Sequence, residues 1–114
     1  MINRLHSFTS RSISATTLAL LSAMYAFAET PQELITKAEK AFDESDVIGA
    51  MSYYRKAAEA GYAPAQNRLA YLLDKSEENE EAVLWYQKAA EQGHAEAEHG
   101  LAGMYVSGDG IAQN

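Results

Sequence analysis

Two histidines and two glutamates lie close together in this 114-residue chain, in the segment HAEAEH from His94 to His99. Histidine and carboxylate side chains are common ligands of divalent metals, and paired ligands on a helix need a spacing of about four residues. His94 and His99 are five residues apart, which places them ~140° apart around a helix. His94 and Glu98 have the required spacing, but a loop histidine followed by an acidic, solvated helix face accounts for them more simply. We therefore predict no metal and no cofactor here.

The sequence lacks common nucleophile motifs for covalent catalysis and a motif for phosphate binding. The chain has no cysteine, which excludes a thiol nucleophile, a disulfide, a thiolate metal site and a lipidated cysteine. No serine lies three residues before a lysine, the spacing of Ser-x-x-Lys nucleophiles. Gly108-Asp109-Gly110 lacks the lysine and the following helix of a phosphate loop and is predicted to be a turn. Without a convergent nucleophile, base and oxyanion donor, we predict that the protein is not an enzyme.

The N-terminal segment, from Met1 to Ala28, differs in kind from the rest of the chain. Arg4 and Arg11 supply positive charge, residues 13–27 contain no charged side chain, and Ala26-Phe27-Ala28 is a small-residue cleavage pattern. This order is typical of a secretory signal peptide. An uncleaved membrane anchor is the alternative, but serines and threonines interrupt the apolar run, which is shorter than the ~20 residues that a spanning helix needs. A cleaved signal peptide over residues 1–28 is therefore expected.

Cleavage near Ala28-Glu29 would export residues 29–114 to a bacterial periplasm or beyond, with membrane contact only during export. The exported part would be strongly acidic. Removal of Arg4 and Arg11 leaves seven basic against 16 acidic residues, so the formal charge changes from −7 to −9. Such a surface repels nucleic acid and anionic membranes, and neither is a predicted partner.

The exported part contains an internal repeat, in which Ala50 corresponds to Ala82 and the following residues pair in the same register. Eleven of the 21 positions from Ala50 to Ala70 are identical to their counterparts in the register that pairs Ala50 with Ala82, without a gap. The longest identical run, Lys56-Ala57-Ala58-Glu59, recurs as Lys88-Ala89-Ala90-Glu91. Duplication is the simplest origin of so many identities at one offset.

Each repeat unit is predicted to form two short helices that stack on their neighbours. In the helix predicted over residues 79–92, large aromatic residues and alanines recur at three- and four-residue spacing and gather on one face. Alanines allow neighbouring helix axes to come close, and the aromatic rings fill the space between them. The residues of this face are Ala82, Trp85, Tyr86, Ala89 and Ala90.

Local signals mark where the helices begin and end. Gly61 and Gly93 supply the left-handed conformation that closes a helix, and Pro64 suits the first turn of the helix that follows. Thr30 and Pro31 begin one more helix upstream, with Thr30 as the cap. Isolated helices this short are unstable in water, so packing must hold them. Five helices are predicted, over residues 31–44, 47–60, 64–74, 79–92 and 95–106.

The segment AVLWYQKAAEQGHAEAEHGL, from Ala82 to Leu101, resembles the Sel-one-like repeat, a relative of the tetratricopeptide repeat. The resemblance continues in MYVSGDGI, residues 104–111. Residues 50–73 match the same pattern, but the family's glycine-x-glycine loop is replaced by Lys75-Ser76-Glu77-Glu78-Asn79. This unit is therefore four residues shorter than the usual unit of the family. Residues 34–57 are more similar to an ordinary tetratricopeptide unit.

This resemblance implies an all-α fold, a short right-handed α/α solenoid of about two and a half helical hairpins over residues 29–114. It also implies a non-catalytic scaffold or adaptor that binds a peptide or protein partner. Exported bacterial members are associated with envelope assembly, signalling complexes and contact with host proteins. Some cysteine-rich relatives have been proposed to act on β-lactams, but this chain lacks their cysteines, so a small hydrolase is the least favoured hypothesis.

The family register indicates which residues face a partner. In a tetratricopeptide-like stack, the first helix of each pair lines a concave surface. The register places Glu39, Asn67, Tyr71 and His99 on that surface. Tyr71 is the strongest candidate, because an exposed aromatic residue anchors a partner at low entropy cost. For each of the four, an exposed residue without a role is the alternative.

The helix predicted over residues 95–106 has no following helix to cover it. Leu101, Met104 and Tyr105 are therefore expected to form an exposed terminal interface, and each side chain left uncovered forgoes ~1.5–3 kcal/mol of burial. Three explanations compete: self-association through this end, docking onto another repeat protein, or a truncated or structural remnant of a longer array without independent activity. A stable monomer with Leu101 and Tyr105 in water would count against the first two.

Overall fold

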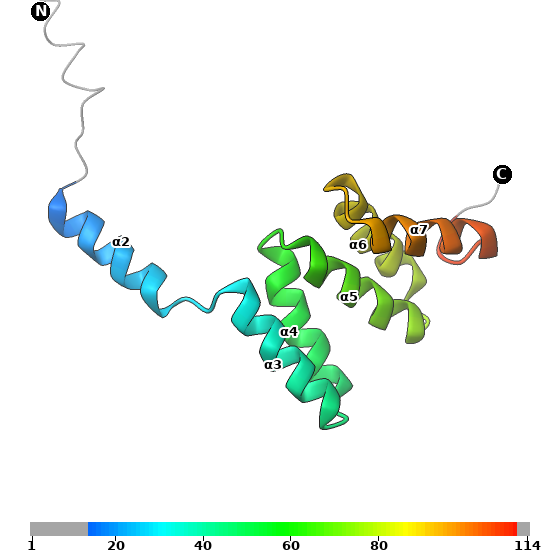
Figure 1. Cartoon of the computed structure of the whole chain (residues 1–114), viewed down its shortest axis with the longest axis horizontal. Helices are drawn as coiled ribbons and strands as arrows, with labels where there is room; N and C mark the ends of the chain where they lie inside the picture. Colours follow the sequence, from blue (N-terminus) through cyan, green and yellow to red (C-terminus); the bar gives the residue numbers. More distant parts are fainter. Residues whose placement is uncertain (1–13, 112–114) are drawn as a thin grey trace, which may run out of the picture.

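The computed structural model describes residues 14–111, and these residues form six helices and no strand (Figure 1). The expected signal peptide begins in residues 1–13, which lie outside the described part. Helix α2 (Ala15–Phe27) stands apart from the other helices and is exposed wherever its side chains are described. Within the described residues, none of the helices combines the length and the apolar character that crossing a membrane requires.

The remaining five helices reproduce the period of the sequence repeat. All five have the same length. The repeat register pairs the first residue of each helix with the first residue of the helix two places further along the chain. All of their ends fall within one residue of the ranges predicted above. They are α3 (Pro31–Asp43), α4 (Val47–Glu59), α5 (Ala63–Lys75), α6 (Asn79–Glu91) and α7 (Ala95–Ser107).

The helix ends follow from local side chains. The Glu33 backbone N–H donates to Thr30 Oγ1 (3.2 Å) and the Thr30 N–H donates to Glu33 Oε2 (2.8 Å), so a capping box begins α3. Gly61 and Gly93 have φ of 90° and 80° and follow the ends of α4 and α6, as predicted. Such angles suit glycine, which has no Cβ to clash.

Consecutive helices pack against each other along the chain. Helices α3 and α4 form one hairpin, α5 and α6 a second, and α7 lies against α6 with a smaller contact to α5 (Figure 1). Tyr54, Trp85 and Tyr86 are buried among alanines. At Gly100 of α7, a Cβ would lie 2.6 Å from the ring of Tyr86, so only glycine permits this approach of α7 to α6. Helices α3 to α7 therefore form an α/α solenoid.

A small polar cluster joins the two hairpins. The buried Gln66 side chain donates from Nε2 to the carbonyl oxygen of Ala58 (3.1 Å) and accepts at Oε1 from Gln92 Nε2 (2.9 Å). Gln92 Nε2 also donates to the carbonyl oxygen of Gly61 (3.1 Å). Because both ends of the buried amide are satisfied, the cluster fixes the relation between α4, α5 and the end of α6 at little desolvation cost.

The exposed terminal face differs from the one predicted. Met104 was expected to be open to solvent and is instead 4% exposed. It lies on the same side of α7 as Ala97, which is turned toward the preceding hairpin and is fully buried. Leu101 is partly buried against the core, whereas Tyr105 remains 53% exposed as expected.

Candidate functional site

A hollow of ≈ 220 Å³ opens between α5, α6 and α7. Three of the four predicted partner-binding residues line it: Asn67, Tyr71 and His99. Asn67 and Tyr71 come from successive turns of α5, and His99 comes from the facing side of α7. The other lining residues are Arg68, Tyr86, Glu96 and Gly100.

A smaller notch of ≈ 60 Å³ adjoins this hollow on the side of the first hairpin. Arg68 and Tyr71 line both spaces, so the two are continuous along α5. We call them together the α5 groove. The remaining residues of the notch are Phe42 of α3, Tyr54 of α4 and Leu72 of α5. The notch is therefore mainly apolar, with the Arg68 guanidinium as its one charged lining group among the described residues.

Asn67 was predicted to be exposed on the concave surface, but it is buried in the wall of the groove. It is only 7% exposed, and its Nδ2 donates to Glu96 Oε2 at 3.1 Å. The α7 helix covers it, and the amide satisfies a carboxylate on that helix. Asn67 thus holds α5 and α7 together and shapes the groove wall.

Glu39 lies beside the groove and lines neither of its two spaces. It is exposed on α3, close enough to Tyr54 for its charge to act on that phenol. Burial chiefly raises the pKa of Tyr54, the negative charge of Glu39 raises it further, and Arg68 opposes the change. Glu39 therefore contributes charge at the rim.

The centre of the groove combines an open aromatic ring with an open cation. Tyr71 is 45% exposed, and the Lys75 ammonium lies 5.5 Å from its ring centroid. Arg68 is exposed and forms no ion pair within the described residues. Below them lies the buried ring of Tyr86, whose phenol is neutral at ordinary pH; burial raises its pKa to about 12. The groove floor is thus neutral and aromatic.

Arg68 and Phe42 are among the groove residues that were not predicted from the sequence. Arg68 is three positions before Tyr71 on the same helix face, a spacing that would have indicated it once Tyr71 was chosen. Phe42 is half exposed at the end of α3 and completes the apolar notch. No local signal separates it from the core residues of α3, because its exposure depends on where α5 lies.

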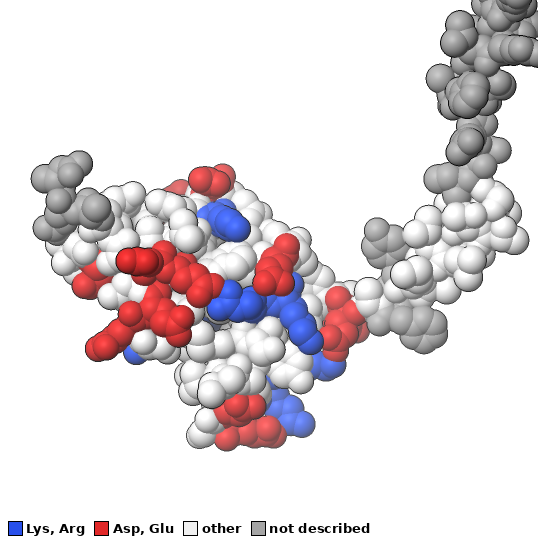
Figure 2. All heavy atoms as spheres, turned by 180° about the vertical axis from the view of Figure 1, so that it is seen from behind, with Lys and Arg blue, Asp and Glu red and all other residues white. Residues whose placement is uncertain are grey.

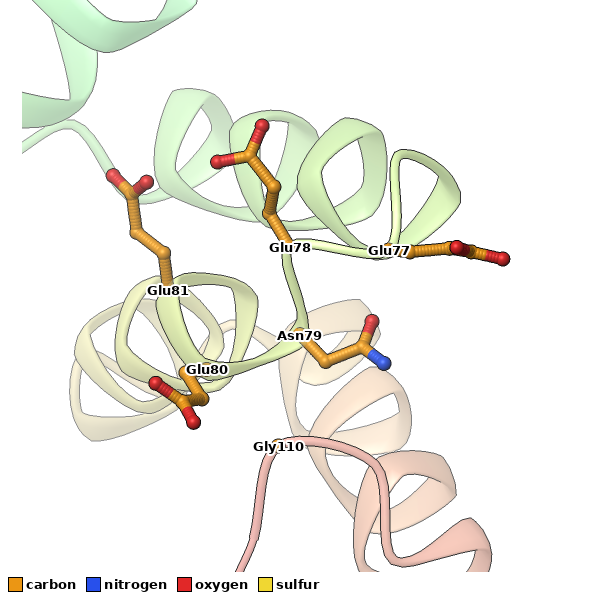
Figure 3. A pocket seen from close by; sticks show the side chains of 6 residues that line it. All are labelled: Glu77, Glu78, Asn79, Glu80, Glu81 and Gly110. Atoms are coloured by element: carbon orange, nitrogen blue, oxygen red, sulfur yellow. The ribbon is translucent and has the colours of Figure 1, made fainter.

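A larger hollow of ≈ 490 Å³ lies elsewhere, at the turn from α5 to α6, where the C-terminal loop folds back (Figure 3). A Cβ at Gly110 would lie 2.5 Å from the backbone of Asn79, which shows how closely this loop approaches. The carboxylates of Glu77, Glu78 and Glu80 point in different directions and do not converge on one point (Figure 3). This hollow is an acidic turn surface without a ligand set.

The histidines of HAEAEH have separate positions. His94 precedes α7, and its Nδ1 accepts from the Ala97 backbone N–H at 3.4 Å, which makes it the helix cap. His99 faces the groove. Among residues 14–111, histidine and carboxylate side chains nowhere gather in the groups of three or more that hold a metal ion.

Hairpins of equal length, stacked at a fixed period and leaving a lined groove, define this chain as an α/α repeat protein of the scaffold class. The model of the Sel1 repeat matches three times, over residues 44–62, 63–94 and 95–114. The chain therefore belongs to the Sel1 repeat family. Comparisons with curated proteins and with solved structures gave no match. Sel1 repeats generally serve protein–protein interaction and are generally not catalytic.

Proposed function

We propose that this protein is an exported, non-catalytic scaffold that binds a peptide segment of a partner protein in the α5 groove. The observation that carries the proposal is the open Tyr71 ring beside the Arg68 guanidinium, which has no ion-pair partner in the described part of the chain, above a neutral aromatic floor. A partner gains apolar contact from the rings and an anchor from the cation without breaking an existing ion pair among residues 14–111.

The size of the groove supports a peptide rather than a folded domain. Its two spaces follow a single helix, and the notch of ≈ 60 Å³ has room for a small side chain. An extended segment can place one apolar side chain in the notch and a polar group near Arg68 and His99. Specificity then comes from a few contacts along α5.

The surface charge favours a partner with compensating groups. Acidic side chains spread over the face of α3–α7 seen in Figure 2, with basic side chains between them. On a chain with formal charge −7, basic segments of a partner are attracted and acidic ones are repelled at a distance. Arg68 lies among the few groups that reverse this preference locally.

A selection of displayed random peptides on the purified chain tests the groove. Peptides that survive selection are expected to lose at least about tenfold in affinity for Tyr71→Ala, because the central aromatic anchor is gone. A matched control is Leu84→Ala, which removes an exposed apolar side chain of α6 outside the groove and should leave affinity unchanged. Peptides that bind Tyr71→Ala as well as the unaltered chain would contradict the proposal. Selection of no peptide would favour a structural role without independent binding.

Export is the second part of the proposal, and the charge and cleavage pattern of residues 1–28 supports it. The test is the N-terminal residue of the protein recovered from a bacterium that expresses the full chain. We expect a periplasmic or secreted product that begins at Glu29. An Ala28→Arg substitution, which disrupts the small-residue pattern, should leave the precursor uncleaved. A cytoplasmic product that begins at Met1 would refute export.

A further inference from the structure

A second surface of the protein becomes visible when α7 is compared with α5, its counterpart in the preceding repeat unit. The side of α5 that faces α6 is buried, and the corresponding side of α7 is open. The buried residues on this side of α5 are Gln66, Leu69, Ala70 and Leu73. Their equivalents on α7 are Glu98, Leu101, Ala102 and Tyr105, of which only Leu101 is partly buried and the others are exposed. We call these four residues the α7 stripe.

Internal duplication identifies the kind of element that fits this stripe. Helix α6 covers the α5 counterpart, and contact between Gln66 and Gln92 at the end of α6 confirms the pairing. The buried face of α6 has the order alanine, two aromatics, alanine, in Ala82, Trp85, Tyr86 and Ala89. The spacing of the α7 stripe, at positions i, i+3, i+4 and i+7, matches a helix with this face.

Glu98 adds a chemical requirement that the α5 surface lacks. Its counterpart Gln66 is a neutral amide that donates to one backbone carbonyl and accepts from Gln92. A carboxylate in the same position cannot donate, and covering it with an apolar or neutral helix leaves a negative charge without compensation. The covering helix must therefore carry a cation where α6 carries Gln92.

The two helices of this type in the chain, α4 and α6, do not meet this requirement. At the position of Gln92 the other helix of this type, α4, is followed by Ala60, so neither offers a lysine or arginine there. A second copy that covered the stripe with α4 or α6 would place no cation at that position against Glu98. The charge complementarity thus favours a different protein over self-association.

We propose that the α7 stripe is the docking site for an amphipathic helix of a partner protein. This helix has an alanine and aromatic buried face like that of α6 and a lysine or arginine at its C-terminal end against Glu98. The site is distinct from the α5 groove and does not depend on the groove's function. Two separate surfaces would make the protein a bridge between two partners.

Two synthetic helices test this docking site. The reference probe has the sequence of residues 79–94, with a covalent staple joining positions 84 and 88, which are both exposed in α6. The charged probe is identical except for Gln92→Arg. Circular dichroism establishes that both are helical before binding to the full-length purified chain is measured by fluorescence anisotropy. We expect the charged probe to bind about tenfold more tightly, the effect of one charge-assisted hydrogen bond.

Variants of α7 locate the binding. Tyr105→Glu, at a site already half exposed, and Leu101→Glu should each weaken both probes at least about tenfold by placing a charge on the apolar stripe. Glu98→Gln should retain binding and abolish the preference for the charged probe. Gly103→Glu is the matched control, since it adds the same charge to α7 where a new side chain meets open space, and it should change neither affinity. Tyr71→Ala should also leave both affinities unchanged, because the groove is a different site.

Several outcomes would overturn the proposal. These are the absence of binding by both helical probes, equal affinity for the two, and binding that survives Tyr105→Glu. Light scattering supplies one more. A dimer of the unaltered chain that Tyr105→Glu separates into folded monomers would show that a second copy covers the stripe.

Discussion

Ser45 and Glu77 occupy equivalent positions in the two turns that close the hairpins, and both have left-handed backbone angles, with φ of 66° and 63°. The turns between hairpins use Gly61 and Gly93 for the same conformation. A residue with a Cβ is strained there by about 1 kcal/mol or more, whereas glycine is not. The hairpin turns therefore hold conformational strain that the other turns avoid.

Glu77→Gly should relieve this strain and stabilise the fold. We expect the free energy of unfolding to rise by about 0.5–1 kcal/mol, after the greater chain entropy of glycine is subtracted. Chemical denaturation measures the change. Glu77→Gln is the control, because it removes the charge from the acidic turn and leaves the backbone strain in place. An equal gain in both variants would assign the effect to charge.

Tyr86 should make stability depend on pH in the alkaline range. Burial raises its pKa to about 12 in the folded chain, from 10.0 when it is free. Between these values the unfolded chain has lost the phenolic proton and the folded chain retains it, so the free energy of unfolding falls as pH rises, by roughly 2–3 kcal/mol in total. Below pH 10 this contribution is fully present.

Denaturation at a series of pH values tests this expectation. Tyr86→Phe should show a smaller alkaline loss than the unaltered chain by that amount. Tyr105→Phe alters an exposed tyrosine and should leave the loss unchanged. A full alkaline loss in Tyr86→Phe would mean that other groups cause it.

At the scale of the helices, the polar cluster around Gln66 explains why the two hairpins stack in one register. The Gln66 amide donates to the Ala58 carbonyl oxygen and accepts from Gln92 at once, which neither an apolar side chain nor an ionised carboxylate can do. Apolar contacts between alanines and aromatic rings tolerate sliding, and a paired buried amide does not. The same argument, applied to Glu98, is the reason why the helix that covers the α7 stripe must carry a cation.

Gln66→Glu reproduces within the chain the situation inferred for Glu98. It should lower the free energy of unfolding at neutral pH by roughly 2–3 kcal/mol, because the carboxylate loses its donor and faces a carbonyl oxygen. Burial disfavours the charged form, so the deficit should shrink as pH falls and the carboxyl becomes protonated. Denaturation at neutral and acidic pH measures both effects. A variant as stable as the unaltered chain at neutral pH would remove the physical basis for the cation.

The helices could be predicted from sequence because their signals are local. The capping residue Thr30, the closing glycines and the three- and four-residue spacing act within a few residues and set each boundary. Burial at Asn67 and Met104 could not be predicted in this way. Whether each is covered depends on how closely α7 approaches, which the small Gly100 against the Tyr86 ring determines.

For the same reason, only part of the candidate site could be predicted from the sequence. Tyr71 and His99 were found from the family register, and they do line the groove. Arg68 and Phe42 become groove residues only because consecutive hairpins bring α3, α5 and α7 around one space. A repeat register predicts which face of a helix a residue occupies. Which residues line a groove depends also on the angle at which the helices pack, which the register does not give.

At the scale of the whole molecule, each helix of the solenoid is stabilised mainly by its neighbours along the chain. Helix α5 is covered on both sides, and α7 is covered on one. Local opening of α7 should therefore require less free energy than opening of α5.

Hydrogen exchange measured by residue tests this gradient. Backbone amides in the middle of α7 should exchange at least about tenfold faster than those in the middle of α5. Saturating the chain with the charged helical probe should slow exchange in α7 and leave α3 unchanged. Equal protection of α5 and α7 in the free chain would show that the solenoid opens only as one unit.

The equal length of the helices and their fixed spacing along the chain have an evolutionary consequence. Duplicating residues 63–94 in frame would insert a complete hairpin whose entry and exit surfaces already fit, since α5 and α7 begin at equivalent positions. Unequal recombination between such copies can lengthen or shorten the protein by whole hairpins in a single genetic event, without an unfolded intermediate for selection to remove. New binding surface can therefore be gained before any residue in it has been optimised.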